Sequence, residues 1–124
     1  MKNRIVIIGG GPAGYEAALA GAKYGADVTV IEERGIGGSS VLLDCVPSKS
    51  FIAGTGIKTD LRRADDMGLN SLLGRARIHL PALNQRVKTL AQEQSDDIIV
   101  QLERAGVRFV HGRGRFAESQ IDQV

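Results

Sequence analysis

The sequence predicts an α/β fold in which helices pack against a parallel sheet, and two observations support this prediction. The first is the apolar, β-branched run at residues 5–8, which is typical of a strand that is buried on both faces. The second is the alternation of segments: an alanine-rich helix is expected over 13–26, a strand over 27–31 and, after further helices, a third strand over 107–111. Short strands separated by helical segments are typical of βαβ units, whose strands are parallel.

A glycine-rich turn with the sequence GGGPAG joins the first strand to the first helix. Its G-x-G-x-x-G spacing, between a strand and a helix, indicates dinucleotide binding. Gly9 allows a tight turn, Gly11 lets the backbone approach a pyrophosphate, and Gly14 lets the helix pack closely on the strand. The helix begins at Pro12 and Ala13, where free N–H groups and the positive end of the helix dipole would meet the phosphates. The alternative is a glycine-rich turn that binds nothing.

An acidic residue, Glu32, ends the second strand and lies 18 positions after Gly14. A carboxylate at this spacing is placed to accept hydrogen bonds from the two hydroxyls of a ribose. The helix that precedes this strand carries small residues, among them Ala18 and Gly21, which permit a close approach to the sheet. Turn, helix, strand and acid together favour dinucleotide binding over an empty turn.

A second glycine-rich stretch follows in the predicted loop 33–40 and contains Gly37 and Gly38. Because this loop leaves the strand end where Glu32 lies, we expect its backbone to approach the same ligand. The alternative is a flexible connection without a ligand.

The segment from Gly37 to Lys49 reads GGSSVLLDCVPSK and resembles the redox segment of the flavoprotein disulfide reductases, the pyridine nucleotide-disulfide oxidoreductases. The pattern of that family is G-G-T-C-x-x-x-x-C-x-P-S-K, and with the glycine turn and Glu32 the resemblance covers essentially the whole chain. It implies FAD as the cofactor and NAD(P)H as the electron donor. It also implies that Cys45 lies beside the flavin ring, that Lys49 lies near the reactive flavin nitrogen, and that Ser39 belongs to the cofactor site. Read alone, Cys45 would more often be a small buried hydrophobe.

The resemblance has one important departure, because Ser40 stands where the family has its first cysteine. Disulfide exchange needs two sulfurs, and serine cannot replace one of them. The segment is most similar to a bacterial branch of NAD(P)H:quinone reductases that are often labelled lipoamide dehydrogenase. We therefore expect a flavoprotein that passes electrons from NAD(P)H to a quinone-like acceptor. The alternatives are a dihydrolipoamide dehydrogenase and, for these residues by themselves, a nucleotide-binding module without catalysis.

Two helices are expected between the second and third strands. The first covers 51–64, and the second covers 81–105 with an apolar stripe to which we assign packing and no chemistry. The intervening 67–79 is expected to be irregular, and His79 is expected to be structural or exposed, not a metal ligand. The packed sides are expected to include Phe51, Ile52, Leu61 and Ala64 in the first helix and Leu83, Val87, Leu90, Ile98, Leu102 and Ala105 in the second.

The third strand ends at a glycine-rich segment, residues 112–116. In the resembled family this strand end supplies backbone groups to the adenine of FAD, and Gly114 is the nearest match. The alternative is a plain glycine hairpin. A full doubly wound sheet has about five or six parallel strands, whereas three are expected in this sequence. We therefore expect residues 1–124 to be the N-terminal portion of an FAD/NAD(P)-binding domain that is inactive alone and forms a homodimer when full-length.

Composition narrows the broad class of protein. The chain is 43% hydrophobic and 24% charged, as is usual for a soluble α/β domain, and its net charge of +2 is too small and dispersed to indicate nucleic acid. No apolar run approaches the length of a membrane span. The first strand begins close to Met1, so we expect no signal peptide, and one cysteine cannot form an internal disulfide. We therefore expect a cytoplasmic protein with a small-molecule acceptor.

Overall fold

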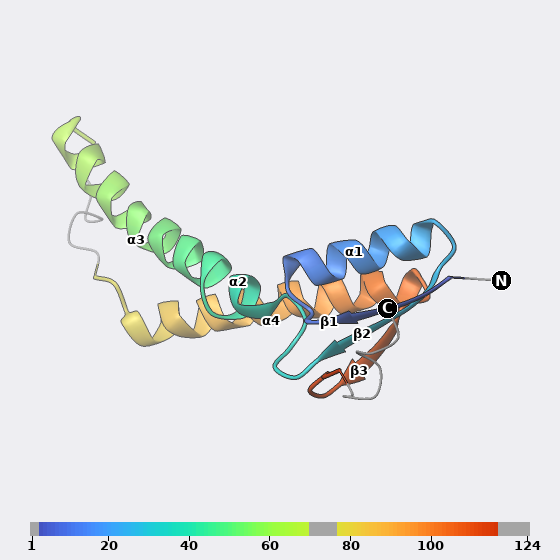
Figure 1. The fold of residues 1–124 in the computed structure, drawn as a ribbon. Helices are drawn as coiled ribbons and strands as arrows, with labels where there is room; N and C mark the ends of the chain where they lie inside the picture. Colours follow the sequence, from blue (N-terminus) through green and yellow to red (C-terminus); the bar gives the residue numbers. More distant parts are fainter. Residues whose placement is uncertain (1–2, 70–76, 117–124) are drawn as a thin grey trace.

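The structure is a computed structural model that describes residues 3–69 and 77–116. Within these residues three parallel strands form one sheet in the order β1-β2-β3, and helices lie between them in the chain (Figure 1). The α/β prediction is therefore confirmed. The elements are β1 (Arg4–Ile8), α1 (Pro12–Lys23), β2 (Asp27–Glu32), α2 (Gly38–Leu42), α3 (Cys45–Asp66), α4 (Leu80–Arg104) and β3 (Arg108–His111).

The core lies on one face of the sheet, between β2 and the helices α1 and α4. Val28 and Val30 of β2 are 1% and 0% exposed, and they pack with Ala18 of α1 and with Ile98 and Leu102 of α4. A Cβ on Gly21 of α1 would lie 3.2 Å from side-chain carbons of Ile5 and Val28, which shows how closely this helix approaches the sheet. Small residues on α1 thus serve the close packing that the sequence predicts.

The opposite face of the sheet is exposed, and this overturns one expectation. Val6 and Ile8 of β1 are 63% and 48% exposed, and Val110 of β3 is 42% exposed. The prediction that residues 5–8 are buried on both faces is therefore wrong. Both crossovers step in the same direction across the sheet, from β1 to β2 and from β2 to β3. Crossovers between parallel strands are almost always right-handed, which places α1 and α4 on the same side, so the described helices cover one face and leave the other open.

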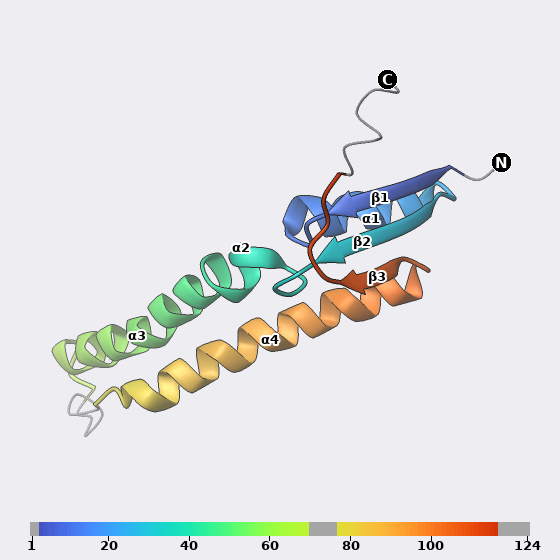
Figure 2. The ribbon, with the colours of Figure 1, turned by 60° about the horizontal axis from the view of Figure 1, so that its bottom comes forward.

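Helix α3 lies beside the N-terminal part of α4, and together they extend away from the sheet, whereas the C-terminal part of α4 lies beside β3 (Figure 2). A Cβ on Gly54 of α3 would lie 2.6 Å from a methyl group of Leu83, so a glycine permits the helices to meet closely there. Phe51 is half-buried, whereas Ile52 is 67% exposed. The prediction that Ile52 packs is wrong, because Ile52 borders an open pocket between α3 and α4 and remains exposed there.

Several predicted boundaries shift. Helix α1 ends at Lys23, before Gly25, whose φ of +83° ends the helical conformation. Helix α2 begins inside the predicted loop 33–40, and α3 begins at Cys45. Ala105, expected in the packed stripe of α4, is the exposed residue that caps its C-terminus. Of the segment 67–79 that the sequence predicts to be irregular, residues 70–76 lie outside the described part. Among the described residues, none of the helices has the length and apolar character needed to cross a membrane.

Candidate dinucleotide-binding site

The first glycine turn is closed against the strand at one position and open at another. Gly9 has a φ of +104°, and its N–H donates to the carbonyl of Ile31 at 2.8 Å. A Cβ on Gly14 would overlap the carbonyl oxygen of Gly9, so α1 can approach the turn only with glycine there. A Cβ on Gly11, by contrast, would meet no atom within 4 Å. The open side at Gly11, next to the start of α1 at Pro12, is therefore where a phosphate can approach backbone N–H groups.

The second glycine loop lies directly against the first. The N–H of Gly37 donates to the carbonyl of Gly10 at 2.7 Å, and a Cβ on Gly38 would lie 2.9 Å from the Cα of Gly11. Gly37 and Gly38 have φ values of +96° and +58°, a region that favours glycine. The two loops therefore form one continuous backbone surface, and the flexible-connection alternative for Gly37 and Gly38 does not describe this arrangement. Ser39 follows in the first turn of α2 and is exposed.

Glu32 is held by backbone donors at the end of β2. Its Oε2 accepts from the N–H of Gly10 at 2.7 Å, and its Oε1 accepts from the N–H of Arg34 at 2.6 Å. Partial burial acts to raise the pKa of Glu32, but the backbone N–H groups of Gly10, Arg34, Gly35 and Glu33 outweigh it and hold the pKa below its ordinary value. The carboxylate is therefore charged at neutral pH and keeps lone pairs free to accept further hydrogen bonds.

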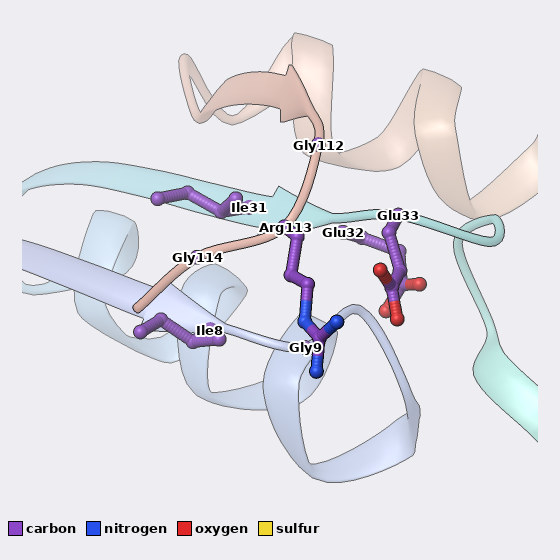
Figure 3. A pocket seen from close by; sticks show the side chains of 8 residues that line it. All are labelled: Ile8, Gly9, Ile31, Glu32, Glu33, Gly112, Arg113 and Gly114. Atoms are coloured by element: carbon purple, nitrogen blue, oxygen red, sulfur yellow. The ribbon is translucent and has the colours of Figure 1, made fainter. Parts of the chain in front are cut away.

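A pocket of about 240 Å³ lies where the three parallel strands end (Figure 3). Figure 3 shows the segment 112–114 leaving β3 and passing over the last residues of β2 and β1, near Ile31 and Ile8. This segment, the Gly9 turn and Glu32 surround one space. A Cβ on Gly114 would lie 2.9 Å from Ile8, so a side chain is difficult to place there. The lining residues are Ile8, Gly9, Ile31, Glu32, Glu33, Gly112, Arg113 and Gly114.

A second pocket of about 500 Å³ shares Glu32 and Glu33 with the first and reaches along α2 to Gly38 and Ser39. The first pocket is smaller than the roughly 300–1,000 Å³ that encloses a drug-sized ligand. It therefore suits one part of a dinucleotide, such as a nucleoside, and the remainder would lie along the two glycine loops. The residues present thus fit a dinucleotide: an acid for ribose hydroxyls, an open backbone surface for phosphates, and a confined space at the strand ends.

Cys45 and Lys49 lie elsewhere, in the first turns of α3. They are four residues apart, so they share one side of the helix, and both are exposed. Cys45 is therefore not the buried hydrophobe that a lone cysteine often is. Neither residue lines either of the two pockets, so the structure does not bring them together with Glu32. A ligand that contacts both regions must be long enough to follow the loop 37–38 and α2.

Sequence reasoning missed several residues of the first pocket, among them two charged ones, Glu33 and Arg113. Glu33 follows β2 directly, and Arg113 lies two residues after the end of β3. Ligands of open α/β sheets bind at the carboxyl ends of strands, so position alone could have found both residues. His79 caps α4: its Nδ1 accepts from the N–H of Ala82 at 3.3 Å. In residues 3–69 and 77–116, no three His, Cys, Asp or Glu side chains gather as metal ligands would.

Comparison with known proteins gives a consistent result. A family model described as pyridine nucleotide-disulphide oxidoreductase matches residues 3–123. The chain is 54% identical over 122 residues to an NAD(P)H dehydrogenase (quinone) of Mycobacterium tuberculosis, which covers 96% of this chain and 25% of that protein. It is 33% identical over 128 residues to dihydrolipoyl dehydrogenase 2 of Haloarcula marismortui, with 97% of this chain and 25% of that protein covered.

A solved structure gives the same likeness. The crystal structure of LpdA from Mycobacterium tuberculosis matches with a TM-score of 0.83 and 54% identity, over 94% of this chain and 25% of that one. The chain thus spans about a quarter of the length of the relatives that it matches.

Proposed function

The chain belongs to the pyridine nucleotide-disulphide oxidoreductase family, and from this premise we propose that it is the FAD-binding part of a flavoprotein that oxidises NAD(P)H and reduces a quinone-like acceptor. The observation that carries the choice of acceptor is Ser40, which occupies the position of the family's first cysteine. Cys45 is the single thiol of the chain, and a dithiol exchange cycle requires a second sulfur. A relative with 54% identity is named an NAD(P)H dehydrogenase (quinone), which supports the same choice.

The nucleotide end of FAD would occupy the pocket at the strand ends. Glu32 would accept hydrogen bonds from the ribose hydroxyls, since its carboxylate is charged and lies at the pocket wall. Gly9 and the backbone near Gly114 would confine the adenine. At the open side of the turn, Gly11 and the N–H groups after Pro12 would hold the pyrophosphate at the positive end of α1.

The second glycine loop and the start of α3 would guide the rest of the cofactor. Gly38 and Ser39 line the second pocket, which leads from Glu32 toward α2. Gly37 supports this pocket through the hydrogen bond from its N–H to the carbonyl of Gly10. Cys45 and Lys49 would lie beside the flavin ring, with Lys49 providing a positive charge one helical turn beyond the thiol. FAD, when bound, supplies the acceptance of hydride and the onward transfer of electrons.

Dihydrolipoamide dehydrogenase is the second candidate, and the names of several relatives favour it. It would need a second thiol from outside residues 1–124, because Ser40 cannot take part in exchange. For the whole protein we further propose a homodimer that acts in the cytoplasm on a small-molecule acceptor. Residues 1–124 alone would bind nucleotide without completing the reaction.

The full-length protein provides the test. Purified protein should show flavin absorption near roughly 450 nm, a property of the cofactor. NADH oxidation should then be fast with a benzoquinone and slow with lipoamide. Protein that takes up no flavin would overturn the FAD assignment, and rapid reduction of lipoamide would favour the second candidate.

A further inference from the structure

Ser95 is a polar residue in the apolar stripe of α4. Among the described residues, Ser95 is the one polar residue whose side chain is buried, with 3% of its surface exposed. It lies between the buried residues Ala91 and Ile98 of the same helix. A buried hydroxyl is unfavourable unless it forms a hydrogen bond. The Oγ of Ser95 donates to the carbonyl oxygen of Ile36 at 2.6 Å, across 59 residues of chain. The hydroxyl therefore has one specific partner, in the loop between β2 and α2.

Ile36 connects this bond to the glycine loops. Its side chain is 1% exposed, and its Cδ1 would lie 2.6 Å from a Cβ on Gly10. The next residue, Gly37, donates its N–H to the carbonyl of Gly10 at 2.7 Å, and Gly38 lies against Gly11. The peptide unit between Ile36 and Gly37 thus takes part in two hydrogen bonds: its carbonyl accepts from Ser95, and its N–H donates to Gly10.

From this geometry we propose that Ser95 is a positioning residue for the cofactor site. Its hydroxyl orients the Ile36–Gly37 peptide, so that the Gly37 N–H points at Gly10 and the second glycine loop stays against the first. This inference rests on the proposed function in one respect, because the ligand of these loops is taken to be FAD. Ser95 touches no ligand in this scheme and acts only through Ile36 and Gly37.

A merely structural role for Ser95 makes a different prediction. If the hydrogen bond of Ser95 only stabilises the fold, its removal would lower the stability of the protein and leave the affinity for FAD unchanged. Ile98 offers a matched control, since it is 3% exposed on the same helix and belongs to the core. Ile98→Val should lower stability without releasing the loop.

The experiment compares wild type, Ser95→Ala and Ile98→Val in the full-length apoprotein. Thermal unfolding gives stability, titration with FAD followed by flavin fluorescence gives Kd, and hydrogen exchange gives the protection of the Gly37 amide. We expect Ser95→Ala to raise the Kd about tenfold and to speed exchange at Gly37, because the peptide loses its partner. Ile98→Val should leave both within about twofold of wild type. If Ser95→Ala does not fold, Ser95→Cys, with similar volume and a weaker donor, should show the same changes at smaller size.

Two results would overturn the proposal, and they differ. If wild type binds FAD and the Ser95 variants bind it equally well, Ser95 has only a structural role. If wild type takes up no FAD, the proposed function fails, and the role of Ser95 in FAD binding fails with it.

Discussion

The carboxylate of Glu32 accepts a 2.7 Å hydrogen bond from the backbone nitrogen of Gly10, 22 residues earlier in the chain. The acid expected to hold a ribose is therefore also part of the glycine turn expected to hold the phosphates. The register of the sheet explains the contact, because Ile8 pairs with Ile31 and the two chains leave parallel strands side by side. The two halves of the motif are thus one structural unit, and a change in one affects the other.

Replacing Glu32 by alanine should weaken FAD binding by about 1–3 kcal/mol, because ribose hydroxyls would lose their acceptor in a partly desolvated pocket. Glu32→Gln should cost less, since its amide oxygen can still accept from Gly10. Titration of the apoprotein with FAD measures both values. Glu33→Gln is the matched control, because Glu33 lines the same pocket and is exposed. Equal affinity in wild type and Glu32→Ala would show that Glu32 is not the ribose acceptor.

Glu32 should also make stability depend on pH in a defined direction. Backbone N–H groups hold its pKa in the folded protein below the ordinary value of 4.5. A group with a lowered folded pKa contributes stability that is present above the unfolded pKa and lost as pH falls through the folded one. Thermal unfolding of the apoprotein should therefore show a constant difference between wild type and Glu32→Gln above about pH 5.5, and a shrinking difference below 4.5. A difference that grows on acidification would contradict the assignment.

Much of this fold could be predicted because its signals are local. The turn at Gly9, the strand β2 and the acid at its end, Glu32, follow one another within a short stretch of the chain. Each residue type there has a steric or chemical reason for its position. The exposure of Val6 could not be predicted, because it depends on which elements cover the outer face of the sheet. The bond from Ser95 to Ile36 joins segments 59 residues apart. A serine inside an apolar stripe is a signal that a partner exists, but the sequence does not say which one.

Gly11 and Gly14 should respond differently to the same substitution. Gly14→Ala places a methyl group on the carbonyl oxygen of Gly9, so it should destabilise the protein by about 1–3 kcal/mol or more. Gly11→Ala meets open space with a φ of −69°, so the apoprotein should keep its stability. Its affinity for FAD should nevertheless fall about tenfold or more, because the methyl group occupies the approach of the pyrophosphate.

Thermal unfolding of the apoprotein and titration with FAD separate these two effects. Gly14→Ala tests the packing of helix on strand, and Gly11→Ala tests the ligand. A Gly11→Ala variant that binds FAD as wild type does would show that the open side of the turn is not the phosphate site.

Cys45→Ser should separate the two candidate activities of the full-length protein. Cys45 is exposed at the start of α3, and with Ser40 in place of the family's first cysteine there is no second thiol in residues 1–124. If electrons pass to a quinone without thiol exchange, turnover with NADH and a benzoquinone should stay within about threefold of wild type. Ser40→Ala is the control, since it changes the position of the missing cysteine without touching Cys45. Lipoamide reduction by wild type that disappears in Cys45→Ser would instead show that a thiol from beyond residue 124 completes the pair, and the protein would be a disulfide reductase.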